Sequence, residues 1–295
     1  MDLSWFWLVI ASMVGMAFAN LVDRIAVSRI FRHSTTFSFF VGAVNFILGL
    51  ATLAVFPFRG SAEQAAFVFA AGVVVGCATL CYYKAMSKGE ATRLAPFFNL
   101  FPLFTLLFAT LFLGEKLSAT QTLGVFLAVA GAFAVTVKDF KKLAFETGAG
   151  IMLAAAIFWG ASEVMQKNAL AALSFWNVWS VIGLGLFATV LPTLLRRETR
   201  EEVFETLTNK KIAVPLVNET VYFVGNLALT AAFSMSLVSI ISAAESIKLA
   251  FLFVFALVAS RFFPKLFKEE LGGRVLAQKI AATALIAVGV YLAAF

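Results

Sequence analysis

Residues 95–118 read APFFNLFPLFTLLFATLFLGEKLS, a hydrophobic stretch that ends at a Gly-Glu-Lys-Leu turn. Residues 240–271 read IISAAESIKLAFLFVFALVASRFFPKLFKEEL, a second hydrophobic stretch that ends at an acidic turn. Each stretch opens with the fourth of five hydrophobic spans in its half of the chain. The sequence therefore predicts one five-span unit that occurs twice.

The composition places almost the whole chain in a membrane. Apolar residues make up 62% of the 295 residues, charged residues make up 13%, and the mean hydropathy is +0.96. A helix needs about 20 apolar residues to cross the hydrocarbon core, and ten such windows can be placed. They predict an all-α polytopic membrane protein with ten transmembrane helices. The windows are residues 5–22, 37–56, 64–83, 95–113, 120–137, 148–166, 176–195, 212–233, 240–260 and 275–295.

The odd number of spans in each unit decides how the units are threaded. After five crossings, the second unit must enter the membrane from the side opposite to the first. We therefore predict two inverted five-helix repeats, with residues 1–140 as the first and residues 141–295 as the second. Many transporters build two alternately open gates around one site from such repeats.

Basic residues are concentrated on one side of the predicted membrane. Eighteen Lys and Arg residues lie in the connections after odd-numbered spans, and only Arg59, Lys116 and Lys167 lie on the other side. Short cytoplasmic loops carry such an excess. We expect a multi-pass protein of the inner cell membrane with both termini outside. The net charge of +7 is then a topology signal and no sign of a nucleic-acid partner.

The first half contains a series of short motifs. They are Tyr-x-Ala-Met at residues 83–86, Pro102, Gly-Glu-Lys-Leu-Ser at residues 114–118, Gly124 and Gly131. The series resembles the EamA domain of the drug/metabolite transporter superfamily, and the layout recurs in the second half. This resemblance implies a ten-helix carrier made of two EamA repeats with a central cavity, often an exporter of small metabolites.

Several ionisable residues lie inside the predicted spans. A charged side chain at the bilayer centre costs about 2.5–3.5 kcal/mol on insertion scales, so each needs a partner or a function. Glu163 lies in the sixth span, with Trp159 one turn before it and Lys167 one turn after it. Their spacing puts all three on one helix face. Glu245 and Lys248 lie three residues apart in the ninth span, close enough to pair on one helix.

A further carboxylate lies in the eighth span. Tyr222 and Asn226 continue the helix face of Glu219. Transport sites of inverted-repeat carriers lie near the bilayer midplane, so we predict that these faces line a polar cavity. The candidate residues for binding substrate or proton are Glu163, Trp159, Glu245, Lys248, Glu219, Tyr222, Asn226 and Lys167.

Other interpretations of these residues stay open. Glu163 with Lys167, and Glu245 with Lys248, could be ion pairs that only hold helices together. The Trp159 ring beside Glu163 would suit an organic cation, and residues 159–163, WGASE, resemble the matching helix of bacterial choline carriers of this superfamily. Because burial disfavours the charged form of a carboxylate, the glutamates could also exchange a proton.

The sequence thus predicts a secondary active transporter that moves a small metabolite or drug-like solute by alternating access. The export direction is implied by the family resemblance. The alternative is a lipid-handling or scaffolding membrane protein without solute transport. An enzyme is not expected, because the single histidine, His33, lies in a loop and no cluster has metal-ligand spacing. We expect no cofactor or metal, and a monomer whose partners are the substrate, a coupling ion such as a proton, and the lipid bilayer.

Overall fold

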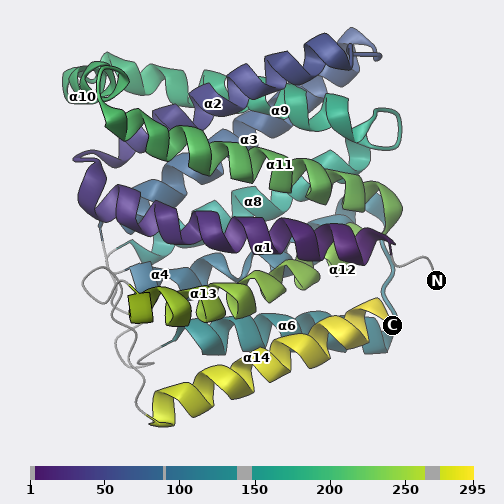
Figure 1. Ribbon diagram of the computed structural model, residues 1–295. Coiled ribbons are helices and arrows are strands. Elements are labelled where there is room, and N and C mark those ends of the chain that lie inside the picture. Colours follow the sequence, from purple (N-terminus) through teal and green to yellow (C-terminus); the bar gives the residue numbers. More distant parts are fainter. Residues whose placement is uncertain (1–3, 89–90, 138–147, 263–272) are drawn as a thin grey trace.

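The computed structural model describes residues 4–88, 91–137, 148–262 and 273–295. The described residues form helices and no strand, and ten stretches among them are long and apolar enough to cross a membrane (Figure 1). The predicted all-α polytopic fold is therefore confirmed. The first half contains α1 (Ser4–Ile25), α2 (Ser34–Val55), α3 (Ala62–Met86), α4 (Ala91–Phe98), α5 (Phe101–Phe108) and α6 (Ala119–Thr136). The second half contains α8 (Ala149–Ala169), α9 (Phe175–Val190), α10 (Arg197–Leu207), α11 (Ala213–Met235), α12 (Val238–Ala244), α13 (Lys248–Phe262) and α14 (Gly273–Ala294).

The long helices lie roughly side by side (Figure 1). At one edge α2 packs against α9, and at the other α6 packs against α14. Between the edges, α3 contacts α8 and α9, whereas α11 contacts α1 and α2. These contacts are symmetric between the two halves. The contact of α3 with α8 corresponds to that of α11 with α1, and the contact of α3 with α9 corresponds to that of α11 with α2. The start of α1 and the end of α14 lie at the same end of the bundle, and α10 lies at the opposite end (Figure 1).

Glycines bring α3 and α9 into backbone contact. A Cβ atom added to Gly72 would lie 2.3 Å from the carbonyl oxygen of Ile182, and one added to Gly185 would lie 2.2 Å from the carbonyl oxygen of Phe69. Lipid tails are as apolar as the helices, so membrane helices gain stability mainly from such close packing.

Two membrane spans are interrupted at corresponding places in the two halves. The first interruption is a turn at Asn99 and Leu100, between α4 and α5, and Leu100 lies two residues before Pro102. Proline lacks a backbone N–H and its ring clashes with the preceding helical turn, which accounts for this break. The second is the 3-10 turn Glu245–Ile247, between α12 and α13. The expectation of one regular helix through Glu245 and Lys248 is therefore wrong.

The short helix α10 holds the connection between α1 and α2. Its buried Glu202 accepts hydrogen bonds from the backbone N–H groups of Arg32 (2.6 Å) and His33 (3.1 Å) and from the hydroxyl of Thr36 (2.8 Å). Arg32 also pairs with Glu205. A carboxylate beside the start of a helix satisfies free N–H groups and interacts favourably with the helix dipole. Glu202 thus caps α2 from another part of the chain.

Candidate substrate-binding site

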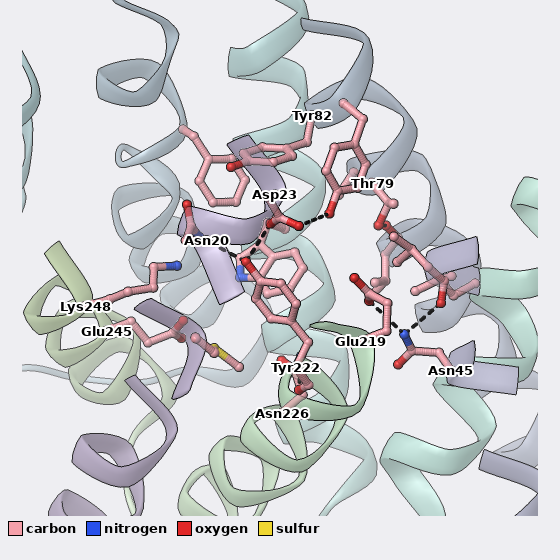
Figure 2. A pocket seen from close by; sticks show the side chains of 18 of the residues that line it. Asn20, Asp23, Asn45, Thr79, Tyr82, Glu219, Tyr222, Asn226, Glu245 and Lys248 are labelled. Atoms are coloured by element: carbon pink, nitrogen blue, oxygen red, sulfur yellow. Dashed lines mark hydrogen bonds between the residues drawn. The ribbon is translucent and has the colours of Figure 1, made fainter. Parts of the chain in front are cut away.

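A cavity of about 100 Å³ is lined by side chains from both halves of the chain (Figure 2). Polar residues of α1, α2, α3 and α11 meet Glu245 of the 3-10 turn and Lys248 of α13 there. Two of the eight predicted binding residues, Glu163 and Lys167, are not in its lining. The six that line it are Trp159, Glu219, Tyr222, Asn226, Glu245 and Lys248.

Asp23 of α1 is the polar centre of this cavity. The hydropathy window ends at residue 22 and leaves Asp23 in the following loop, but the helix continues to Ile25. The carboxylate is 1% exposed and accepts hydrogen bonds from Tyr83 (3.2 Å), Asn218 (2.8 Å) and Tyr222 (2.7 Å). The sequence interpretation missed this residue because an acidic side chain at the end of a hydrophobic window looks like a solvated one.

Two asparagines extend the network to neighbouring helices (Figure 2). Asn20 lies one turn before Asp23 and donates to the hydroxyl of Tyr222 (3.1 Å). Asn45 of α2 donates to Glu219 (3.4 Å). Both asparagines thus form hydrogen bonds between helices. The three-residue spacing of Asn20 and Asp23 was the available signal that this face of α1 turns inward.

Glu219 is buried beside the same network. Its carboxylate accepts hydrogen bonds from Asn218 (3.3 Å) and Asn45 (3.4 Å), so each of its oxygens has one protein donor. Trp179 lines the cavity, and its indole N–H has no hydrogen-bond acceptor among the described residues. Within the described ranges, no group of three His, Cys, Asp or Glu side chains could hold a metal ion.

Glu163 and Glu245 form a contact between α8 and the 3-10 turn. The two carboxyl groups lie within hydrogen-bonding reach of each other. Glu163 also accepts a hydrogen bond from Thr105 (2.7 Å), and Ser242 donates to the same threonine hydroxyl (3.2 Å). One oxygen of each glutamate has no donor among the described residues. Because a hydrogen bond between two carboxyl groups needs a proton on one of them, this pair is suited to hold one proton.

The two intramembrane lysines do not form the ion pairs of the alternative interpretation. The Lys167 amine donates to the carbonyl oxygens of Phe233 (2.7 Å) and Ser236 (2.8 Å), at the end of α11, where a cation stabilises the helix dipole. The pairing of Lys167 with Glu163 is therefore wrong. Lys248 has no hydrogen bond and no ion pair within 4.0 Å in the described part of the chain, so the pairing with Glu245 is not formed either.

A second, smaller cavity of about 30 Å³ adjoins the central one. The two share Asn20, Tyr82, Phe98 and Lys248 in their linings. Arg24, near the end of α1, lines only the smaller cavity. Together the cavities lead from the centre toward the end of the bundle where α1 and α3 end and α4 begins.

The Gly-Glu-Lys-Leu motif joins the halves beyond the other end of the central cavity. Gly114 has a φ of 65°, a left-handed conformation that favours glycine. The following Glu115 is buried, and its carboxylate accepts the N–H groups of Val238 (2.8 Å) and Ser239 (3.2 Å) and the Ser239 hydroxyl (2.7 Å). The motif of the first half thus caps the start of α12 in the second half.

Comparisons with known proteins agree with this architecture. The profile of the EamA-like transporter family matches residues 3–137. A protein of a Sinorhizobium species, described as an uncharacterized transporter in the cobO 3' region, is 38% identical over 71 residues, which are 24% of this chain. The chain spans 50% of the length of that relative.

A solved structure, described only as the crystal structure of a protein, is similar in fold. Its TM-score is 0.67 at 18% identity, over 99% of this chain and 96% of the other. At this identity the likeness concerns the fold alone. With the ten apolar spans of the described residues, these findings show a multi-pass membrane protein in which residues 3–137 match the EamA-like transporter family.

Proposed function

We propose that this protein is a secondary active transporter that moves a small metabolite or drug-like solute by alternating access, in the export direction. The observation that carries the proposal is the polar cavity between the halves, flanked by two spans that are interrupted at corresponding places. In inverted-repeat carriers, such discontinuous helices form the substrate site near the bilayer midplane. The transporter description of the Sinorhizobium relative supports the same class.

The inverted threading of the halves is part of this proposal. It is supported by the odd number of spans per half and by helix contacts that interchange when the halves are exchanged. The second EamA repeat, residues 141–295, and the inner-membrane location belong to the same proposal. A monomer contains both halves and is sufficient as the transport unit.

The two ends of the cavity differ, as alternating access requires. Toward one end the smaller cavity continues past Lys248 to Arg24. Toward the other end, Glu115 and Lys167 bind backbone groups at the start of α12 and the end of α11. If the basic connections are cytoplasmic, a solute destined for export would enter past Arg24. It would leave after the contacts of Glu115 or Lys167 have opened.

A proton is the proposed coupling ion, with the Glu163–Glu245 pair as its binding site. The pair joins α8 to the turn between α12 and α13, so opening of the cavity would separate the two carboxyl groups. Once the two carboxyl groups are apart, they can no longer share one proton, so the movement would favour proton uptake or release. Glu219 is a second candidate, since it lines the cavity and is buried.

The proposal is tested with the purified full-length chain in lipid vesicles loaded with a pH-sensitive dye. Gradients of small amines, amino acids, nucleobases, sugars and carboxylates are applied in turn, and proton flux and solute uptake are both measured. We expect one class to move and to drive proton flux. Glu163→Gln or Glu245→Gln is expected to abolish the proton flux, whereas Glu63→Gln, an exposed control on α3, should not.

Each negative result has a defined meaning. Unchanged proton flux in Glu163→Gln, Glu219→Gln and Glu245→Gln alike would exclude proton coupling at these residues. Failure of every solute class to move would contradict the transport function itself and would favour the lipid-handling or scaffolding alternative.

A further inference from the structure

Resting on the proposed transport function, we propose that the central cavity takes an organic anion. This anion has a small apolar body that carries a carboxylate, and the Lys248 amine binds that carboxylate. The inference names a substrate class for the site, which neither the family match nor the relative specifies.

The first argument is the unused hydrogen-bonding capacity of Lys248. Its amine extends into the cavity on the side of Asn20 (Figure 2). It carries three N–H donors, yet it makes no hydrogen bond or ion pair with the described residues. An amine in the middle of a membrane is costly unless an acceptor satisfies it. A bound carboxylate would supply both the acceptor oxygens and the opposite charge.

The second argument is that the acidic residues of the site are already engaged. Asp23 accepts three hydrogen bonds from protein donors, and Glu219 accepts two. Glu245 lies against Glu163. A cationic ligand would compete with these protein donors at Asp23 and Glu219, and one oxygen of Glu245 is the carboxylate oxygen of the lining that has no donor among the described residues. The organic-cation interpretation of Trp159 and Glu163 is also weakened, because Trp159 lines the cavity and Glu163 does not.

The third argument is the path to the site. Arg24 and Lys248 line the same smaller cavity. The Arg24 side chain, like that of Lys248, has no hydrogen bond or ion pair with the part of the chain that the structure describes. Two positive charges along one path attract an anion toward the centre. Asp23 and Glu245 lie near enough to interact electrostatically with Lys248, but neither forms a hydrogen bond or an ion pair within 4.0 Å with its amine.

The side chains that line the central cavity also indicate the apolar part of the ligand, which carries the carboxylate. Tyr82, Phe98, Trp159 and Trp179 line the central cavity, and aromatic rings favour an apolar or aromatic partner. The cavity has room for a small solute only. One amine matches the single charge of a carboxylate better than the nearly double charge of a phosphate monoester at neutral pH.

The test is a thermal-unfolding assay on the purified full-length protein in detergent with four matched probes. The probes are phenylacetate, phenylacetamide, phenethylamine and phenyl phosphate, so that only the polar group changes. A ligand that binds the folded state raises the apparent melting temperature. We expect phenylacetate to raise it and the neutral amide and the amine not to.

Variants at position 248 make the test specific. Lys248→Gln should weaken phenylacetate binding by roughly tenfold to a hundredfold, the effect of losing one charge-assisted hydrogen bond. Lys248→Arg, which keeps the charge, should retain binding. Lys84→Gln, the same change at an exposed lysine of α3, should leave binding unchanged. Size-exclusion chromatography shows that each variant is folded, and the arginine variant provides the comparison if Lys248→Gln is not.

The proposal would be overturned if phenylacetate gives no stabilisation, if the amide or amine stabilises equally, or if Lys248→Gln and Lys248→Arg both bind as the unaltered chain does. Stronger stabilisation by phenyl phosphate would overturn the assignment of the anion as a carboxylate. If phenylacetate binds through Lys248 but vesicles show no transport of any solute class, the anion site stands and the proposed function fails.

Discussion

At the scale of single residues, one carboxylate explains why the Gly-Glu-Lys-Leu motif matters. Glu115 binds three donors at the start of α12, in the other half of the chain. In a membrane the first N–H groups of a helix find no water to bind, so they need protein acceptors. The left-handed Gly114 turns the chain at the point where this carboxylate must point inward.

We predict that Glu115→Gln lowers the melting temperature of the purified protein. The amide keeps one acceptor oxygen but turns an N–H₂ group toward backbone donors, at a cost of about 1–3 kcal/mol for a donor left without a partner. Thermal unfolding monitored by size-exclusion chromatography measures the change. Glu63→Gln, at an exposed position of α3, is the matched control, and equal melting temperatures for the two variants would contradict the capping role.

At the scale of elements, α10 and the start of α2 form a pH-sensitive joint outside the membrane spans. Burial alone raises the pKa of Glu202. The hydrogen bonds from Arg32, Thr36 and His33 outweigh this effect and hold the pKa below its ordinary value of 4.5. The pKa of Glu202 is higher in the unfolded chain, about 4.5, than in the folded chain. Above the unfolded value, the charged carboxylate contributes its full stabilisation to the fold. The stabilisation is lost as the pH falls through the lower pKa of the folded state.

The matching prediction is that Glu202→Gln unfolds at a lower temperature at neutral pH and loses less stability on acidification. Melting temperatures of the variant and the unaltered protein, measured from about pH 7 to about pH 3, should converge at the acid end. Glu63→Gln should follow the unaltered protein throughout. A constant difference between Glu202→Gln and the unaltered protein at every pH would rule out the proposed linkage.

The interrupted spans show how elements place chemistry in a membrane. The break between α4 and α5 is set by Pro102, a local property of the sequence. The break between α12 and α13 has no proline or glycine, and it coincides with the contact of Glu245 with Glu163 of α8. One break could therefore be expected from the sequence, whereas the other depends on packing between distant helices.

At the scale of the whole molecule, the charge asymmetry predicts which end faces the cytoplasm. Arg59 and Arg200 are both exposed, in connections assigned to opposite sides. In a chain with Cys77 and Cys81 replaced by serine, we expect a membrane-impermeant maleimide to label Arg59→Cys in intact cells. Arg200→Cys should be labelled only after the membrane is opened. The reverse pattern, or labelling of both in intact cells, would contradict the threading.

The sequence by itself determined the ten spans and six of the residues that line the cavity. Hydropathy and helical periodicity are properties of short stretches, so they can be read along the chain without knowing its fold. Lys248, Glu245 and Glu219 stood out because a charge inside a hydrophobic span is costly wherever its helix packs.

Only the tertiary structure decided which partner each side chain has. Asp23 became the centre of the site through Tyr222, and Glu163 turned away from Lys167 toward Thr105 and Glu245. The sequence also gave no sign that Lys248 would make no hydrogen bond or close ion pair with the described residues. The physical reason is that a hydrogen bond forms between atoms a few ångströms apart, and which helices come that close depends on how all of them pack.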